Sequence, residues 1–353
     1  MYQDGIGTHN VSFMATIGNI DFISALYCIL LTISFVAFVF LDEDKRSKAI
    51  HLISIFMGFF IFIIINVMSG RIALLMTFVI LFPFIITNSK RLSRTIVAFS
   101  MILLGLLLNI IINPEYHYDV GELGLYFQFN GIAMMFIVVI GIFLLLAYIL
   151  KKREFDISKN KKVIYGIYLA IIISILMVII FLYVVDFQNG ILHEIHELLH
   201  GNFDDDFGTY RVFLWKRAFK LIPEHPILGS GPDTFAVRFM DKYTEDVASI
   251  GELTINDTAA NVYITMIINI GIIGLISYLI FIFLQLIYGV KKKNKYSKIL
   301  LIAIITYVIQ DCFNLWVVIV TPVFWTLMAI HFLSIKEINE VNKIENGGET
   351  YEK

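Results

Sequence analysis

The stretch VIYGIYLAIIISILMVIIFLYVV, residues 163–185, contains no charged side chain and decides the fold. The hydrocarbon core of a bilayer is spanned by roughly 20 consecutive apolar residues in an α-helix. A helix pairs all of its backbone N–H and C=O groups internally, which lipid requires because it offers no hydrogen-bond partner. This stretch therefore predicts a transmembrane helix and sets the pattern to look for in the rest of the chain.

The composition extends this interpretation to the whole chain. The 353 residues are 58% hydrophobic and 16% charged, whereas soluble domains carry about 25% charged residues. The sequence therefore predicts an all-α, polytopic integral membrane protein with about nine transmembrane helices. The predicted spans are 20–41, 48–68, 72–87, 95–113, 130–150, 163–185, 262–287, 298–315 and 317–335.

Basic side chains in alternate loops orient these helices. They are Lys45, Arg46 and Lys48, then Lys90, Arg91 and Arg94, then Lys151, Lys152, Arg153, Lys161 and Lys162, and finally Lys291, Lys292 and Lys293. Because basic loops stay in the cytoplasm, the remaining loops are predicted to face outward. The expected domains are an extracytoplasmic segment 1–19, six spans in 20–185, a large extracytoplasmic loop at 186–260 with short amphipathic helices, three spans in 261–335 and a cytoplasmic tail 336–353.

The predicted topology places segment 1–19 outside without an earlier span to carry it across. Either this segment translocates by itself or upstream helices are missing, and we favour the second reading.

Charge and cysteine content exclude several classes of function. The formal net charge is −2 and the basic residues are spread over short loops, so no nucleic-acid partner is expected. Cys28 and Cys312 both lie in apolar stretches, which argues against a disulfide framework or a cysteine-based zinc site. No metal and no cofactor are expected.

One short motif favours a different class of enzyme. His196-Glu197-Leu-Leu-His200 matches the pattern H-E-x-x-H, which on a helix places two imidazoles on one face for zinc, and His193 shares that face. The pattern has only three fixed positions, and no further ligand stands out. A membrane zinc metalloprotease is therefore a remote alternative, and a solvated amphipathic turn is favoured.

Polar residues gather at the predicted outer ends of the spans. Such residues are costly in lipid, so they face either neighbouring helices or a wet cavity. Their number at one side favours a polar cavity that opens outward beneath the large loop. They are Asn66, Ser69, Arg71, Asn109, Asn261, Thr265, Asn269, Tyr307, Gln310, Asp311 and Asn314.

The large loop contains a predicted helix followed by a glycine turn. Thr209 is expected to cap a helix of about three turns that Pro223 ends. Gly229-Ser-Gly231 then forms a turn whose backbone N–H groups face either an anion or only their own chain.

These blocks resemble the O-antigen ligase and polysaccharide polymerase family of bacterial membrane glycosyltransferases. The resemblance begins with Arg211, continues with Trp215 one turn later, and includes Pro-x-x-Gly-x-Gly-x-x-x-Phe at residues 226–235. A second block is similar to the family's His-Asn, nine residues, then Gly-x-x-Gly. Further similar positions are Gly18-Asn19, Ser69-Gly70-Arg71, Asp257 to Tyr263, Gly271, Gly274, Gln310, Asn314, Phe324 and Trp325.

One position departs from the family pattern. The usual histidine is replaced by Ala260, while the following Asn261 is kept. If that histidine activates the acceptor or neutralises charge, this chain must use another group or is impaired. Asp257 and Asp311 are the available carboxylates, and His225 is the nearest loop imidazole in the sequence.

The resemblance implies glycan transfer from an undecaprenyl-diphosphate-linked oligosaccharide in the bacterial cytoplasmic membrane, with the active site facing outward. A polymerase of surface polysaccharide repeat units is favoured, with a chain-length regulator and a flippase as partners besides the lipid bilayer. The alternatives are ligase-type transfer to another acceptor and a transporter or flippase of lipid-linked glycans, for which inverted repeats and broken helices are expected and none is recognised. The implied catalytic residues are Arg71, Arg211, Asp257 and Asn261, and the implied substrate-binding residues are Arg217, Gly229, Gly231, Arg238, Tyr263, Gln310, Asp311 and Asn314.

Overall fold

A computed structural model describes residue 17 and residues 19–42, 44–116, 132–187, 190–249, 257–291, 294–316 and 319–348. Side chains are described for the same residues except 113–116, 132–133 and 335–348. Most of the predicted segment 1–19, Lys292, Lys293 and the end of the predicted tail lie outside these ranges. The chain divides into two compact units, and each is described by itself.

The described residues confirm an all-α, polytopic membrane protein. Eight of their helices are long and apolar enough to cross a membrane. The ninth prediction, a span at 317–335, differs from the structure, because the apolar part of that helix covers only Thr321–Ser334. Pro322 fits the first turn of a helix, where its missing N–H is not needed, and this helix begins at Thr321.

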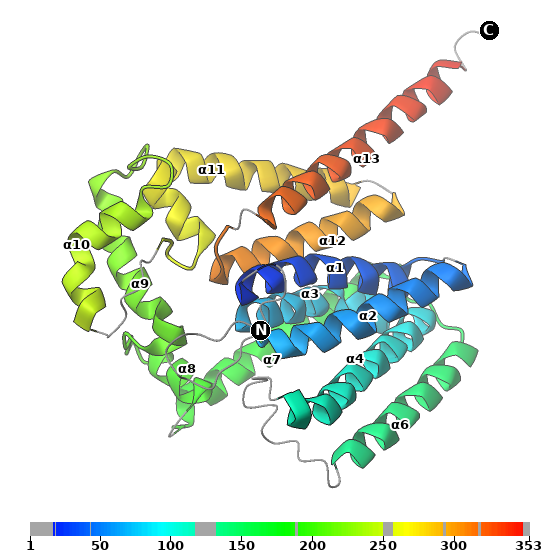
Figure 1. The fold of residues 1–353 in the computed structure, drawn as a ribbon. Coiled ribbons are helices and arrows are strands. Elements are labelled where there is room, and N and C mark those ends of the chain that lie inside the picture. The colour runs from blue at the N-terminus through cyan, green and yellow to red at the C-terminus, as the bar shows by residue number, and fades with distance from the viewer. Residues whose placement is uncertain are drawn as a thin grey trace. The chain divides into compact units, whose positions relative to one another are not determined.

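Unit 1 comprises Met1–Ile164, Gln285–Gln310 and Val317–Lys353. Within it, α1 packs against α2, α3, α4 and α12, while α6 lies along α4 and α13 along α12 (Figure 1). The helices are α1 (Ile20–Phe40), α2 (Lys45–Ile65), α3 (Met68–Ile86), α4 (Ser89–Tyr116), α6 (Ile132–Lys152), α12 (Lys295–Gln310) and α13 (Thr321–Gly348).

Three threonine hydroxyls join the central helices of unit 1. Thr306 of α12 meets Thr32 of α1 at 3.1 Å and Thr77 of α3 at 2.8 Å, oxygen to oxygen. All three side chains are buried. Hydrogen bonds of this kind hold helices together in lipid, where the apolar effect between helices is weak.

A glycine sets the close approach of α4 to α2. A Cβ atom built on Gly105 would lie 3.3 Å from the backbone nitrogen of Phe60. One turn further, the Asn109 amide donates a hydrogen bond of 3.2 Å to the Phe60 carbonyl. The two backbones therefore touch because one of them carries no side chain at the contact.

Three of the predicted cytoplasmic loops meet at one end of unit 1. The Ser89 N–H donates to the Phe155 carbonyl at 3.0 Å, and the Ile157 N–H donates to the Thr87 carbonyl at 2.9 Å. The Arg94 guanidinium donates to the Leu41 carbonyl at 2.6 Å. The loops that follow α1, α3 and α6 therefore share one side of the bundle, as the alternation of basic loops predicts.

Unit 2 comprises Tyr165–Leu284 and Asp311–Trp316. The predicted large loop forms short helices whose apolar faces share a core with α11, built around Phe213, Phe235 and Phe239. The elements are α7 (Lys161–Val184), α8 (Ile191–Leu199), α9 (Phe207–Leu221), η1 (Ile222–Glu224), α10 (Phe235–Ser249), α11 (Val262–Lys291) and η2 (Asp311–Phe313).

The start of α9 differs from the sequence prediction. Gly208, Thr209 and Tyr210 all have left-handed backbone angles, so Thr209 lies inside a left-handed turn and does not cap the helix. Regular helix begins with Arg211. The predicted end is confirmed, because the α-helix gives way to the short 3-10 turn that contains Pro223.

The contact of α4 with α2 yields a stability prediction. We expect Gly105→Leu to force the two backbones apart and to lower the melting temperature of the purified protein in detergent. Gly141→Leu on α6 is the matched control, because a Cβ atom there meets nothing within 4 Å. Equal melting temperatures for the two variants would contradict the prediction.

Candidate functional site

Helix α11 is broken at Gly271, where φ is 68° and ψ is −177°. A break leaves the carbonyls before it and the N–H groups after it without partners inside the helix. The segment 226–231 supplies those partners through its backbone, and we call this contact the glycine clamp. Its four hydrogen bonds are Ser230 N to Ile268 O (2.9 Å), Gly231 N to Asn269 O (2.9 Å), Ile272 N to Pro226 O (3.0 Å) and Ile273 N to Ile227 O (3.3 Å).

The glycine clamp has no room for side chains. A Cβ atom on Gly229 would lie 2.4 Å from the carbonyl carbon and oxygen of Asn269. A Cβ atom on Gly271 would lie 2.1 Å from the Ile227 carbonyl oxygen, in addition to the positive φ. Both glycine motifs of the sequence are therefore parts of one backbone contact.

The clamp also uses the N–H groups that the sequence assigned to substrate. Gly229 donates its N–H to the His225 carbonyl at 3.1 Å, and Gly231 donates to Asn269. Neither glycine therefore offers its N–H to an anion. The structure gives both glycines a packing function, and their predicted contact with substrate stays a prediction.

Asn261 holds the turn that precedes α11. Its Oδ1 accepts a hydrogen bond of 3.0 Å from the Ile264 N–H and caps the helix, while its Nδ2 donates to the Cys312 carbonyl at 2.7 Å. Trp215 of α9 donates from Nε1 to the Ala259 carbonyl at 2.9 Å. Both ends of the Asn261 amide are thus engaged, which supports a positioning role, and its predicted catalytic role stays a prediction.

Ala260 lies in the same turn with φ at 47°. His, Asn and Asp are enriched in this left-handed region relative to other residues. The backbone therefore suits the histidine of the family pattern, but an alanine carries no group that can take up a proton.

A cavity of about 290 Å³ lies within unit 2 beside this turn. Two exposed carboxylates, Asp233 and Asp257, line it together with the Trp316 side chain. Asn269 also lines it, and its Oδ1 atom is buried and accepts no hydrogen bond within the described part of the chain. The arrangement joins an aromatic surface to polar acceptors, which suits a sugar.

Sequence analysis missed Asp233 as a cavity residue. Its φ of 57° lies in the left-handed region, and it follows Gly231 of the clamp by two residues. The clamp fixes the position of the Asp233 carboxylate, and the sequence around Asp233 alone does not indicate this position. Only the pairing of the two glycine motifs could have predicted it.

Asp311, Asn314 and Tyr263 lie around the cavity wall. Trp316 donates from Nε1 to the Asp311 Oδ2 at 3.4 Å, and Asp311 and Asn314 are only 2% and 3% exposed. The ring of Tyr278 meets that of Trp316 at 5.5 Å and that of Tyr263 at 6.4 Å, between centroids. Asp311 and Tyr278 therefore contact Trp316, and Tyr263 in turn contacts Tyr278.

Arg211 begins the regular part of α9. Its Nη1 donates to the Gly208 carbonyl at 3.0 Å, which fixes the side chain against the left-handed turn. Its Nε is buried and has no hydrogen-bond partner among the described residues. The guanidinium therefore retains a donor for a ligand.

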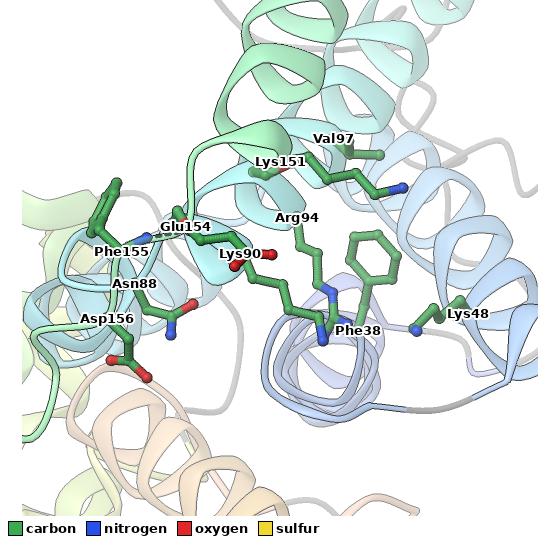
Figure 2. Close-up of a pocket in the computed structure, with 12 residues that line it drawn as sticks. Phe38, Lys48, Asn88, Lys90, Arg94, Val97, Lys151, Glu154, Phe155 and Asp156 are labelled. Carbon is green, nitrogen blue, oxygen red and sulfur yellow. Dashed lines mark hydrogen bonds between the residues drawn. The ribbon is translucent and has the colours of Figure 1, made fainter.

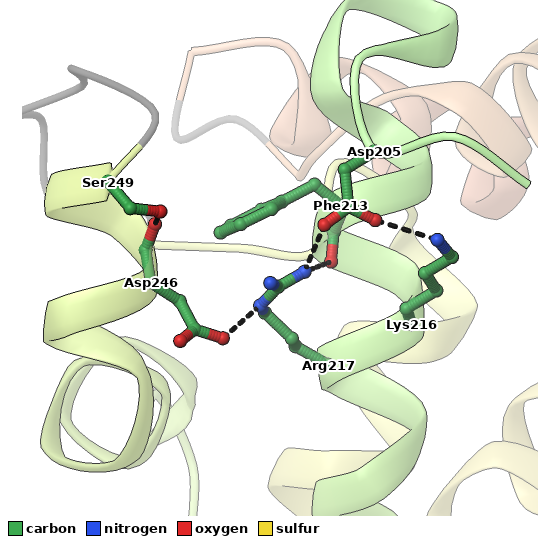
Figure 3. A network of polar contacts seen from close by, with 6 residues as sticks. All are labelled: Asp205, Phe213, Lys216, Arg217, Asp246 and Ser249. Atoms are coloured by element: carbon green, nitrogen blue, oxygen red, sulfur yellow. Dashed lines mark hydrogen bonds and ion pairs between the residues drawn. The ribbon is translucent and has the colours of Figure 1, made fainter.

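Arg217 has a different environment, as Figure 3 shows. Its Nε donates to Asp246 of α10 at 2.6 Å, and its Nη1 donates to Asp205 at 2.9 Å. The guanidinium also lies 3.6 Å from the centroid of the Phe213 ring. Arg217 thus joins α9 to α10, and Arg238 is likewise paired with Glu224. Substrate binding by these two arginines stays a prediction that the geometry does not favour.

Two further predicted residues, Arg71 and Gln310, belong to unit 1. Arg71 donates to Asn66 and lines a cavity of about 390 Å³ whose other lining side chains are mostly apolar. Gln310 is 1% exposed, and neither side-chain atom has a hydrogen-bond partner within the described residues.

The histidines of the H-E-x-x-H motif bind backbone carbonyls. The Nδ1 of His196 meets the Leu182 carbonyl at 2.9 Å, and the Nδ1 of His200 meets the His196 carbonyl at 2.9 Å. The neighbouring His193 likewise meets the Phe187 carbonyl at 2.7 Å. Among the described residues, no three His, Cys, Asp or Glu side chains are grouped to hold a metal ion. The H-E-x-x-H spacing therefore does not bring three metal-binding side chains together among the described residues.

The glycine clamp predicts a strong effect of one methyl group. We expect Gly271→Ala to lower the melting temperature and the yield of folded protein, because the methyl group would collide with a backbone carbonyl. Gly166→Ala on α7 is the matched control, since a Cβ atom there meets nothing within 4 Å. Equal thermal stability of both variants would show that the clamp opens without cost.

The ion pairs of Arg217 predict an acid response. Burial raises the pKa of Asp205, but the hydrogen bonds from Lys216 and Arg217 outweigh it and hold that pKa below its usual value. Because the folded-state pKa is depressed, the stabilisation is complete above about pH 3.9 and is lost as pH falls through the folded-state value. We expect Asp205→Asn to lower the melting temperature at neutral pH, with the difference from the parent shrinking below about pH 3.9.

Thermal unfolding across this pH range tests the prediction. Exposed Asp241→Asn on α10 is the control and should match the parent at each pH. A deficit of Asp205→Asn that does not change with pH would mean that the carboxyl group acts through packing and not through its charge.

Comparison with known proteins adds to this geometry. No curated protein and no solved structure matches the chain. Residues 120–279 match a family model described as O-antigen ligase. The matched range covers Arg211, the 226–231 half of the clamp, Gly271 and Asp257 to Asn261, and it includes most of the residues that line the cavity in unit 2. Residues 120–279 are thus similar to a domain of the O-antigen ligase family.

Proposed function

We propose that this protein transfers a glycan from undecaprenyl diphosphate to a sugar hydroxyl at the outer face of the bacterial cytoplasmic membrane, and so polymerises the repeat units of a surface polysaccharide. The family domain supports glycosyl transfer of the O-antigen ligase or polymerase type. The cavity of unit 2 carries the proposal further, because it joins two carboxylates to an aromatic ring.

The cavity is assigned to the acceptor sugar. Carboxylate oxygens of Asp233 and Asp257 accept hydrogen bonds from sugar hydroxyls. The buried Oδ1 of Asn269 can accept a further hydrogen bond from the sugar. The Trp316 side chain provides an apolar surface for the face of the ring. These groups suit a neutral or amino sugar better than an acidic one.

In the proposed reaction, Asp257 accepts the proton of the acceptor hydroxyl and replaces the histidine that Ala260 lacks. The hydroxyl oxygen then bonds to the anomeric carbon of the donor. The bond between that carbon and the diphosphate oxygen breaks, and its electron pair leaves with the diphosphate. The free Nε donor of Arg211 supports its assignment to this leaving group, since a guanidinium binds phosphate oxygens well.

Unit 1 supports a separate assignment for the lipid. Arg71 is the one charged residue among those that line the apolar cavity. A polyprenyl diphosphate combines an apolar chain with a charged head, so Arg71 is assigned to the head and the apolar walls to the first isoprene units. The neighbouring Asn66 orients the guanidinium.

Polymerase is favoured over ligase because the cavity assigned to the acceptor is small. At about 290 Å³ it fits a sugar residue and not the acyl chains of a lipid acceptor. A chain-length regulator and a flippase that delivers the donor are the expected partners of such a polymerase.

A transporter of lipid-linked glycans is the rival function, and one observation bears on it. The sequence analysis recognised no broken helix, and this was wrong, because α11 breaks at Gly271. In transporters, the freed carbonyls of such a break bind ions or substrate. Here the carbonyls of Ile268 and Asn269 accept hydrogen bonds from the clamp. The break therefore serves to dock a loop, which favours the enzyme.

The proposed base and arginine are tested in a strain that lacks the chromosomal gene. We expect plasmid-borne parent protein to restore long polysaccharide chains, and Asp257→Asn to leave mostly single repeat units, since loss of a general base lowers rates by about 100-fold or more. Arg211→Ala should do the same. Asp241→Asn is the matched control and should restore long chains.

The distribution of the lipid-linked units separates the two functions. An enzyme defect leaves undecaprenyl-diphosphate-linked units at the outer face, where added glycosidase reaches them in intact cells. Protected units in the Asp257→Asn strain would support the transporter and overturn the enzyme. Full restoration by Asp257→Asn would remove this carboxylate from the chemistry.

A further inference from the structure

A second large cavity lies in unit 1, at the end of the bundle where the three basic loops meet. Its volume is about 740 Å³, and its walls come from α1, α2, α4, α6 and the segment after α6. Asn88, which lines it, follows Arg71 by 17 positions and lies just beyond the end of α3. At 1.5 Å per residue this is about 25 Å, so the cavity and Arg71 lie at opposite ends of a helix that is long enough to span the membrane.

Four cationic side chains line this cavity. Lys48 comes from α2, Lys90 and Arg94 from α4, and Lys151 from the last turn of α6. Figure 2 shows the charged ends of Lys90, Arg94 and Lys48 around the ring of Phe38, with Lys151 extending along the cavity as well. Residues from three helices thus converge on one space.

The carboxylates nearby do not balance these cations. Asp42 binds Lys90 and Arg94, at 2.6 Å in each case, and the hydrogen bond from Lys90, followed by that from Arg94, lowers the pKa of Asp42 to about 2. Glu154 and Asp156 are the acidic residues that line the cavity. Four cations and three carboxylates leave one positive charge, which is the charge that a single phosphodiester neutralises.

Lys48 and Lys151 are the two lining cations that form no ion pair with Asp42. Neither has an ion-pair partner among the described residues, whereas Lys90 and Arg94 share Asp42. Like charges that converge in excess over the nearby carboxylates repel each other and destabilise the folded state. An anionic ligand between them would remove that repulsion.

The cavity is also amphipathic. Phe38 and Val97 form apolar wall below the charged groups, and Val97 lies one turn further into the bundle than Ser93. On the adjoining α2 and α6, large apolar side chains such as Ile53 and Leu145 are exposed on the protein surface. A ligand with a charged head and apolar chains fits this setting better than a free anion does.

We propose that this cavity binds the phosphate headgroup of an anionic phospholipid from the cytoplasmic leaflet, with the phosphate between Lys48 and Lys151 and the acyl chains along α2 and α6. Basic pockets between helix ends at the cytoplasmic surface suit such lipids. The lipid would hold the loops after α1, α3 and α6 together. The site is independent of the proposed glycan transfer.

The test uses the full chain, purified in a zwitterionic detergent. Its melting temperature is measured against rising mole fractions of phosphatidylglycerol, with phosphatidylcholine as the uncharged reference. We expect phosphatidylglycerol to raise the melting temperature and phosphatidylcholine to change it little. Lys48→Gln with Lys151→Gln should weaken the apparent affinity for phosphatidylglycerol by about 10- to 30-fold, at roughly 1 kcal/mol for each basic residue.

Matched variants separate this site from general surface charge. Lys291→Gln with Lys298→Gln removes two exposed lysines near the loop between α11 and α12, outside the cavity, and should keep the parent response. Lys48→Arg with Lys151→Arg should also keep it. Because the readout is the lipid-dependent shift, a lower starting stability of a variant does not obscure the result.

Three outcomes would overturn the proposal. An equal loss in both glutamine variants would assign the effect to the overall charge of that surface. An equal shift with glycerol 3-phosphate, which has no acyl chains, would identify a site for a free anion. No difference between phosphatidylglycerol and phosphatidylcholine would exclude an anionic lipid site altogether.

Discussion

The backbone contact between segment 226–231 and the break in α11 is the constraint on which unit 2 depends. Four N–H groups and four carbonyls that would otherwise be unpaired in an apolar setting pair with one another across it. In such surroundings each unpaired group costs several kcal/mol. The contact can form only because Gly229 and Gly271 carry no side chain.

The polar groups of unit 2 divide into two sets with different uses. Asn261, Trp215 and Arg217 form hydrogen bonds within the protein. Asn261 and Trp215 hold the turn before α11, and Arg217 joins α9 to α10. Asp233, Asp257 and Asn269 instead face a cavity. A site of this kind needs both sets, because a reactive carboxylate is useful only when rigid neighbours fix its position.

The apolar runs of the sequence were enough to predict the helical membrane fold, because length and hydropathy alone decide whether a helix can span lipid. They could not reveal the break in α11, since the run at 262–287 is apolar on both sides of Gly271 and its partner segment lies about 40 positions earlier. For the same reason Asp233 looked like an ordinary loop residue. Arg217 and Arg238 are arginines of the same predicted loop as Arg211, so the sequence could not separate the three. Their ion pairs with nearby carboxylates distinguish Arg217 and Arg238 from Arg211.

The glycine clamp has one more consequence, which concerns divergence between relatives. Residues 232–267 leave the clamp at Gly231 and return to it at Ile268, so both ends of this stretch are fixed at the same place. The stretch contains the two cavity carboxylates and the whole of α10. Within this stretch, Asp233 and Asp257 contribute no atom to the hydrogen bonds of the clamp. The side chains at these two positions can therefore differ between relatives without opening the clamp.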